Sequence, residues 1–197
     1  MSADERCPAE ILSRIRTALS DVPDPERPVD VPVKRGYRRE TDLSPVDRLE
    51  ERLHDYSATV RRVKADGAAA AVLEGCREMA VRRAAVPRDL PLHWRPDEIE
   101  LLEDHDLSAR ELDELDGVIT GCAAAIAEAG TLILDGQGVS GWRAITLIPD
   151  HHICIVEAHQ VAGLVPEAIA RVSRSVSDQR LPITILGSRG HRTTSDD

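Results

Sequence analysis

Aromatic side chains are almost absent from this sequence. They make up 2% of the chain, and phenylalanine does not occur at all. Hydrophobic residues still account for 42% of the 197 residues, which is enough for a core of ordinary size. The core therefore has to be built mainly from Ala, Val, Leu and Ile, which are among the residue types that proteins most often bury.

The sequence also lacks an excess of positive charge and a long apolar run. Lys and Arg number 25 against 35 Asp and Glu, which gives a net charge of -10. An acidic chain has no general attraction for phosphate groups, so nucleic acid and anionic membranes are poor candidate partners. No apolar run approaches the roughly 18 residues of a membrane span, and residues 1–10 are too polar for a secretory signal. We therefore expect a soluble cytoplasmic protein.

Closely spaced cysteine pairs are a third absence. The four cysteines stand at positions 7, 76, 122 and 154, and no two form a Cys-x-x-Cys pair. This spacing fits neither a zinc ribbon nor a ligated iron–sulfur cluster. We therefore expect reduced thiols, with no metal and no cofactor in this chain.

The first 43 residues differ in pattern from the rest. Residues 8–20 carry Ile11, Leu12, Ile15 and Leu19 at helical spacing, which predicts an amphipathic helix. Four prolines then fall between positions 23 and 32, which excludes a helix and a central strand there. We expect residues 1–43 to be a helix and a proline-rich arm that could pack on a second subunit of a homodimer, and residues 44–197 to form the main domain.

From residue 44 onward, helical and strand-like patterns alternate. Helices are predicted at 44–58, 67–79, 106–116, 123–130 and 165–176. Strands are predicted at 59–65, 80–87, 117–121, 131–135, 144–149, 153–158 and 181–187. This alternation indicates an α/β fold with a mostly parallel sheet and flanking helices. Ligands of such sheets usually bind at the carboxyl ends of the strands.

Residues 136–141 read Gly-x-Gly-x-x-Gly, the spacing of a dinucleotide-binding loop. That site needs a helix directly after the third glycine, with its amino end facing the pyrophosphate. Here residues 142–149 form a β-rich run that ends at Pro149, so a helix does not fit. We interpret the segment as a glycine-rich connection, in which Gly136 and Gly138 let the backbone approach a ligand closely.

Residues 148–160 concentrate three histidines, a cysteine and two carboxylates. On a strand, His152 and Cys154 share one face, while His151, Ile153 and Ile155 share the other. Two ligands do not make a metal site, and His54, His93 and His105 cannot be placed beside them from the sequence. The favoured interpretation is a core strand with polar residues at its ends. His152 is then the leading candidate for proton transfer, because histidine titrates near neutral pH.

Three motifs follow one another in the second half of the chain. They are Glu-x-Gly-Thr at Glu128, Gly130 and Thr131; Leu-x-Pro-Asp-x-His at Leu147, Pro149, Asp150 and His152; and Pro-x-Thr at Pro182 and Thr184. Their order and spacing over residues 117–186 resemble the LUD-domain family. The resemblance implies a NagB/RpiA/CoA-transferase-like fold. It also implies a part in the oxidation of L-lactate to pyruvate, which allows growth on lactate. The partners would be two iron–sulfur proteins of lactate utilisation, which would carry the clusters that this chain lacks.

The resemblance also suggests site residues. Glu128, Asp150 and His152 are candidate catalytic residues, and Thr131, Gly136, Gly138, Thr194 and Ser195 are candidate contacts to a small carboxylate substrate. The alternative is a stand-alone isomerase or acyl-transferase-type enzyme, which would act on a small phosphorylated or carboxylated substrate. In that enzyme Glu128 would be the base or nucleophile and His152 the acid.

The C-terminal segment departs from the family pattern. Gly190, Thr194, Ser195 and Asp196 can match a family turn, but the Ile-Glu and His-Gly-Pro residues that follow it in relatives are absent. We expect a truncated or altered C-terminus, which would leave a sheet edge unpaired. The alternative is a disordered polar tail.

Overall fold

The computed structural model describes residues 8–20, 44–179 and 184–186. The chain divides into two compact units, Met1–Tyr37 and Arg38–Asp197. In the first unit, α1 (Pro8–Ala18) confirms the predicted amphipathic helix, and its large apolar side chains are about half exposed. The predicted proline-rich arm and the predicted C-terminal turn lie outside the described residues, as do Thr194 and Ser195, and the boundary at residue 43 stays a prediction.

The second unit contains a four-stranded parallel sheet. It contains β1 (Arg83–Val86), β2 (Glu100–Glu103), β3 (Gly117–Gly121) and β6 (His151–Ile155) in the order β2-β1-β3-β6. All three strand pairs are parallel, which confirms the predicted α/β class. The sequence pattern did not predict β2, and β6 begins two residues earlier than predicted.

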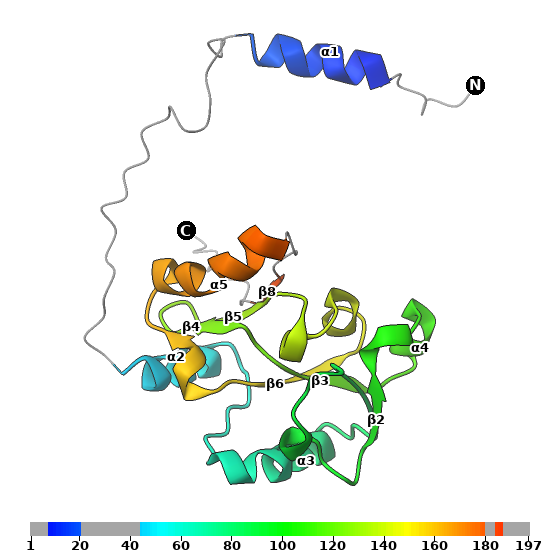
Figure 1. Cartoon of the computed structure of the whole chain (residues 1–197), viewed down its shortest axis with the longest axis vertical. Coiled ribbons are helices and arrows are strands. Elements are labelled where there is room, and N and C mark those ends of the chain that lie inside the picture. Colours follow the sequence, from blue (N-terminus) through cyan, green and yellow to red (C-terminus); the bar gives the residue numbers. More distant parts are fainter. Residues whose placement is uncertain (1–7, 21–43, 180–183, 187–197) are drawn as a thin grey trace, which may run out of the picture. The chain divides into compact units, whose positions relative to one another are not determined.

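Helices cover both faces of this parallel sheet (Figure 1). On one face Ile119 of β3 packs in a cluster with Val72 and Cys76 of α3 (Ala68–Glu78). On the other face Val118 packs in a cluster with Leu112 of α4 (Ala109–Asp113). Strand β3 is buried along its whole length, which explains why its sequence is a continuous apolar and small-residue run rather than an alternating one.

A second sheet has the order β7-β4-β5-β8. It contains β4 (Ala124–Ile126), β5 (Thr131–Leu134), β7 (Val161–Ala162) and β8 (Thr184–Leu186). The β4–β5 and β5–β8 pairs are antiparallel, whereas β4–β7 is parallel. One face packs on α5 (Val165–Gln179), which Figure 1 shows lying across β4 and β5. Residues of the other face cluster with Leu49 of α2 (Pro45–Asp55).

The predicted helix at 123–130 is wrong. Residues Ala124–Ile126 are β4, and a turn leads from them to Gly130. Alanine has the highest helix propensity, but the advantage is worth less than about 1 kcal/mol per residue over most other residues. Here the segment is paired on both sides by β5 and β7 between two helix layers. Tertiary pairing has therefore overridden the local propensity.

Two predicted strands are also wrong. Within 144–149 the chain forms a 3-10 helix, Arg143–Thr146, which buries Ile145 in the cluster beneath α4. Within 59–65 there is no strand. Arg61 pairs there with Glu78 of α3, and Arg62 pairs with carboxylates of α2. The segment 59–65 is therefore joined to α2 and α3 by ion pairs and is not part of a sheet.

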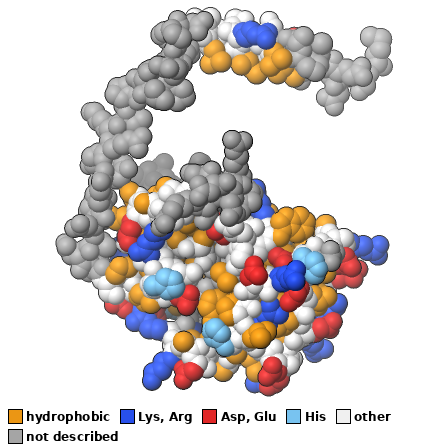
Figure 2. All heavy atoms as spheres, viewed as in Figure 1, with side chains coloured by type: hydrophobic (Ala, Val, Ile, Leu, Met, Phe, Trp, Pro, Cys, Tyr) orange, Lys and Arg blue, Asp and Glu red, His pale blue; other side chains and the backbone are white. Residues whose placement is uncertain are grey.

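The surface carries many exposed ion pairs, such as Arg48–Glu51 at 2.6 Å and Arg77–Glu98 at 2.5 Å. Figure 2 shows acidic and basic side chains interspersed over the face that it draws. Each exposed pair stabilises the fold only slightly. None of the helices in the described ranges is long and apolar enough to cross a membrane.

Asp116 connects the start of β3 to the start of β1. Its Oδ2 accepts hydrogen bonds from the backbone N–H groups of Arg82 and Arg83, both at 2.9 Å. These two bonds lower the pKa of the Asp116 carboxyl below its usual value of 3.8. Because the folded pKa is depressed, the stabilisation is present above about pH 4 and is lost as the pH falls through the folded pKa.

We expect Asp116→Asn to lower the free energy of unfolding at pH 7 by less than about 1 kcal/mol, since solvent screens an exposed carboxylate. The difference from the parent chain should shrink toward pH 3.5. Urea unfolding followed by circular dichroism at pH 7, 5 and 3.5 measures it, with Asp113→Asn on α4 as control. An equal difference at all three pH values would contradict this account.

Candidate functional site

Two adjoining cavities lie where the strands of the parallel sheet end. Their volumes are about 410 and 490 Å³, and both are lined by Asp89, Gln137 and Gly138. The first cavity is also lined by Arg88, which follows β1, and by Asp104, which follows β2. We call the two cavities together the carboxyl-edge cleft. This is the edge at which parallel sheets usually bind ligands.

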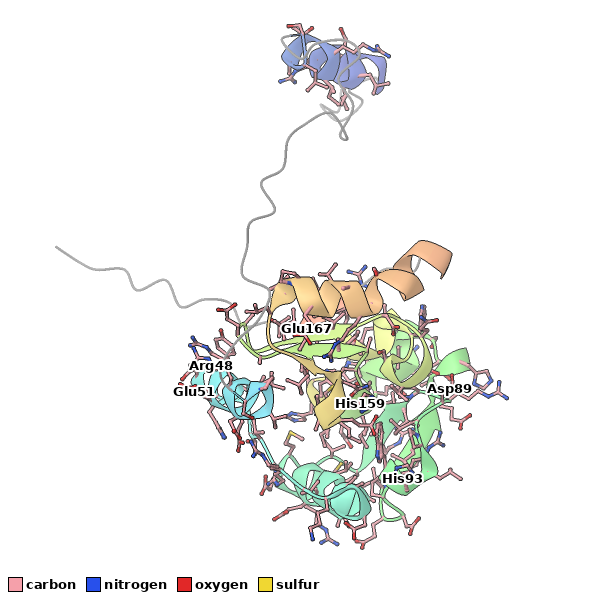
Figure 3. All side chains as sticks on the ribbon, turned by 60° about the vertical axis from the view of Figure 1, so that its left-hand side comes forward. Arg48, Glu51, Asp89, His93, His159 and Glu167 are labelled. Carbon is pink, nitrogen blue, oxygen red and sulfur yellow. The ribbon has the colours of Figure 1, made fainter. Side chains whose placement is uncertain are left out.

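Further residues of the second cavity come from the segments that follow β3, β5 and β6 and from α5. They are Cys122, Ala123, Asp135, Gln160, Arg171 and Val172. The cavity is therefore built by both sheets. In Figure 3, Asp89 lies well away from Arg48 and Glu51 of α2, so the cleft and α2 lie on different sides of the unit.

Three glycines shape the loop of residues 136–141, which separates the two cavities. Gly136, Gly138 and Gly141 have φ angles of 74, 51 and 66°, a region that other residues rarely adopt. A Cβ atom on Gly141 would lie 2.6 Å from Ile145 Cδ1 and 2.7 Å from Pro87 Cγ. A Cβ atom on Gly138 would have no heavy atom within 4 Å. Gly141 is thus required by packing, whereas Gly138 faces open space in the cleft.

The loop does not lead into an α-helix. It ends in a short 3-10 helix, Gly138–Ser140, and the next element is the 3-10 helix Arg143–Thr146. The prediction that no helix follows the third glycine is confirmed, although the run after it is not the expected strand. The geometry required for a bound pyrophosphate at a helix amino end is not formed here.

Asp104 holds this loop against the strand ends. Its side chain is 8% exposed. Oδ2 accepts a hydrogen bond from the Trp142 N–H at 2.9 Å, and Oδ1 accepts one from the Arg88 N–H at 3.4 Å. One buried carboxylate therefore connects the segments that follow β1 and β2 to the glycine-rich loop.

The second cavity contains buried polar groups. Asp135 is 9% exposed, and its Oδ2 accepts a hydrogen bond from Gln137 Nε2 at 3.1 Å. Gln160 is fixed by its donation to the Cys122 carbonyl at 2.7 Å and by acceptance from the Glu157 N–H at 2.9 Å. Ser140 is fully buried, and its Oγ has no hydrogen-bond partner among the described residues. Such an unsatisfied hydroxyl costs about 1–3 kcal/mol.

Arg171 of α5 supplies positive charge to the cavity wall. Its guanidinium donates to the His159 carbonyl at 2.8 Å and to Glu167 Oε1 at 2.5 Å. Figure 3 shows Glu167 at the start of α5 and His159 on the segment that precedes this helix. Because a guanidinium carries five N–H donors, these two bonds fix its orientation and leave donors for an anion.

The predicted site residues do not all meet at this cleft. Gly136 and Gly138 line it. Glu128 lies in the turn between β4 and β5, where its N–H donates to the Gly163 carbonyl. Thr131 begins β5 and donates its hydroxyl to the Ala129 carbonyl at 3.3 Å. Four residues of extended chain, roughly 13 Å, separate Thr131 from Asp135 at the cleft.

Asp150 and His152 lie at the amino end of β6, at the opposite edge of the sheet from the cleft. The ring Nε2 of His152 is 2.8 Å from Thr120 Oγ1 of β3. Burial lowers the pKa of His152 from 6.5 to about 4. Its imidazole is therefore neutral at pH 7. The structure does not place Asp150 and His152 in the same sheet as Glu128, and the catalytic roles of all three stay predictions.

Of the two thiols near this histidine, Cys122 is buried and Cys154 is partly buried. Cys154 lies opposite Thr120 in the β3–β6 register. Ile153 and Ile155 pack on the α3 side, on the other face of the strand from Cys154, as the predicted alternation requires. A hydrogen bond with Cys154, together with burial, raises the pKa of the Cys122 thiol. Within the described ranges no three His, Cys, Asp or Glu side chains gather closely enough to hold a metal ion.

Sequence reasoning missed most of the polar groups of the cleft. Asp104 and Asp135 each follow directly after a strand, and polar residues at strand ends were a usable signal. Ser140 stands inside the glycine motif, where only the glycines were singled out. Gln160 and Arg171 come from segments far along the chain and carry no local signal.

The two glycines provide a stability test. We expect Gly141→Ala to lower the free energy of unfolding by about 3 kcal/mol or more, because the positive φ angle and the contacts with Pro87 and Ile145 are both unfavourable. Gly138→Ala should cost only about 1 kcal/mol, since its methyl group meets open space. Urea unfolding of both variants measures the difference, and equal losses would contradict the assigned packing.

The partly buried His152 predicts that the stability of the fold depends on pH. Between pH 6.5 and 4 the unfolded chain binds a proton at His152 that the folded chain does not, so the free energy of unfolding falls as the pH is lowered. At pH 5 the loss should be about 2 kcal/mol. His152→Gln should remove this loss between pH 7 and pH 5, whereas His151→Gln, on the other face of the strand, should retain it. If both variants still lost stability between pH 7 and pH 5, the loss would arise from a group other than His152.

Comparisons with known proteins agree on one family. The LUD domain profile matches residues 46–196. A lactate utilization protein C from Deinococcus radiodurans is 37% identical over 191 residues, which cover 95% of this chain and 84% of the relative. A crystal structure of a DUF162 family protein from Deinococcus radiodurans is similar in fold. Its TM-score is 0.69 with 38% identity, over 73% of this chain and 86% of that chain. The LUD domain match extends over three quarters of the sequence and includes the cleft. The chain therefore belongs to the LUD domain family.

Proposed function

We propose that this protein takes part in lactate utilisation, as a subunit of a system that oxidises L-lactate to pyruvate. The observation that carries the proposal is the 37% identity to a protein named lactate utilization protein C, which extends over 95% of this chain. Similarity over nearly the whole length, rather than over one motif, favours a shared role and not only a shared fold.

The side chains of this chain support a separation of roles between it and its partners. Lactate oxidation removes two electrons, which need an acceptor. Among the described residues, Cys122 and Cys154 lie close together, but no third His, Cys, Asp or Glu side chain joins them closely enough to hold a metal. A hydrogen bond with Cys154, together with burial, raises the pKa of Cys122, and burial raises that of Cys76. We therefore assign electron transfer to two iron–sulfur partner proteins. In this proposal the present chain binds those partners and a small carboxylate, which the guanidinium of Arg171 would pair with at the carboxyl-edge cleft.

Growth on lactate tests the proposal. In a strain from which other lactate-oxidising enzymes have been removed, deletion of this gene should abolish growth on L-lactate but not on pyruvate. The wild-type gene should restore growth. Arg171→Gln should restore it poorly, and the exposed control Arg110→Gln should restore it fully. Undiminished growth of the deletion strain on L-lactate would refute the role.

Affinity purification tests the partners separately. Tagged protein from lactate-grown cells should retain proteins that contain iron and acid-labile sulfide, as iron–sulfur clusters do. The mixture should reduce an artificial electron acceptor with L-lactate. Lactate oxidation by the isolated chain alone would contradict the assignment of electron transfer to partners.

A further inference from the structure

Two thiols meet across the neighbouring strands β3 and β6. Cys154 lies on β6 directly opposite Thr120 of β3. The alternation of β3, continued to Cys122, puts the Cys122 side chain on the same face as Thr120. The Cys122 thiol forms a hydrogen bond with Cys154, and its Sγ is 3.7 Å from Oε1 of Gln160, on the segment that follows β6. Both contacts direct the Cys122 sulfur toward β6, and the two sulfurs are not bonded to each other.

The two cysteines differ in how easily a reagent reaches them. Cys122 is 0% exposed, whereas Cys154 is partly exposed. Among the described strands, β6 lies at an edge of the parallel sheet, and each of its five residues is partly exposed. The third described cysteine, Cys76, packs on the other face of the sheet with Ile119. A small oxidant can therefore reach Cys154 from the open side of β6, and Cys122 is the thiol next to it.

The contact between the two thiols also determines which of them reacts first. The hydrogen bond with Cys154, together with burial, raises the pKa of Cys122. Two adjacent thiols do not both ionise readily, because like charges repel each other. Cys122 therefore keeps its proton, and a thiolate of this pair forms on Cys154. Since the thiolate is the nucleophile in thiol chemistry, Cys154 is the residue that attacks an oxidant.

The strand geometry allows a bond between the two sulfurs. Neighbouring strands lie about 4.8 Å apart, and disulfides join residues whose Cα atoms are about 4.4–6.8 Å apart. The offset of two residues between Cys122 and Cys154 lengthens the separation beyond the strand spacing. Cys122, however, lies after Gly121, the last residue of β3 that pairs with β6. Closing the remaining distance therefore does not require a hydrogen bond between the two strands to break.

We propose that Cys122 and Cys154 are a redox-active pair, which a peroxide converts reversibly into an intrachain disulfide. The Cys154 thiolate attacks one peroxide oxygen and the O–O bond breaks, which leaves a sulfenic acid on Cys154 and one water after protonation. The Cys122 sulfur then attacks the Cys154 sulfur. The S–O bond breaks, and the leaving hydroxide takes the Cys122 proton to form a second water. The two thiols lose two electrons, which reduce the peroxide.

The disulfide would lie beside the second cavity of the cleft. Cys122 and Gln160 both line this cavity, and Gln160 Nε2 donates to the Cys122 carbonyl at 2.7 Å. Oxidation would add a covalent bond between the segment after β3 and β6, close to this hydrogen bond. The inference concerns the oxidation of this chain alone and does not depend on the proposed function.

Thiol counting with the full chain tests the stoichiometry. The reduced chain has four cysteines. One equivalent of hydrogen peroxide should lower the number of thiols that are counted after denaturation from four to two per chain, and dithiothreitol should restore all four. A count that stays at four, or a loss that dithiothreitol does not reverse, would overturn the proposal.

Peptide mapping identifies the bonded residues. Trypsin cleaves after Arg143, between the two cysteines, so Cys122 and Cys154 fall on different peptides. Mass spectrometry of the oxidised chain, with free thiols blocked before digestion, should find these two peptides linked within one chain. A link that instead involves Cys7 or Cys76, or one that joins two chains, would refute the assignment.

Variants separate the roles of the two thiols. In Cys122→Ala, the sulfenic acid on Cys154 has no thiol beside it, so it should persist and be trapped by dimedone. In Cys154→Ala, peroxide should consume the Cys122 thiol at least about tenfold more slowly than in the wild type, because that thiol is buried and protonated. Cys76→Ala should still form the disulfide. Circular dichroism shows which variants fold, and the wild-type peptide map decides the proposal if one does not. Equally fast oxidation of Cys122 without Cys154 would contradict the assigned order.

Discussion

The close approach of Gly141 to Pro87 and Ile145 is the contact on which the carboxyl-edge cleft depends. A methyl group at Gly141 would lie within 2.7 Å of both neighbours, so only glycine allows the loop to pack against the end of β1. Asp104 secures the same junction with hydrogen bonds to Trp142 and Arg88. A chain almost without aromatic residues reaches core density through small side chains, and its backbones therefore lie close together.

This packing brings acidic groups to one edge of the sheet. Asp104 and Asp135 follow directly after β2 and β5, but their tasks differ. Both oxygens of Asp104 accept backbone N–H groups, which makes it structural. Asp135 is bonded to its near neighbour Gln137 and lines open volume. The first carboxylate holds the loop in place, and the second lines the open cavity.

How far the sequence predicts this protein depends on the range of the interactions involved. Strand β3 and helix α4 were predictable, since β3 is a continuous buried run and α4 begins with a capping box at Ser108. Strand β4 was not, because an alanine-rich segment takes its structure from its neighbours. Within the cleft, Gly136 and Gly138 were recognisable from local spacing. Asp135 and Arg171 line the same cavity only after β5 and α5 have packed together.

The placement of His152 shows why a dense motif can mislead. Three histidines within thirteen residues suggest a reactive site, yet β6 separates His151 from His152 by strand alternation, and His152 bonds to Thr120 of the neighbouring strand. Burial leaves this imidazole neutral at pH 7. The cavities instead lie at the other edge of the parallel sheet, where each strand leads into a connecting segment. In a parallel sheet all strands end at one edge, so residues distant in sequence are brought together there, and a search confined to local motifs finds only part of the site.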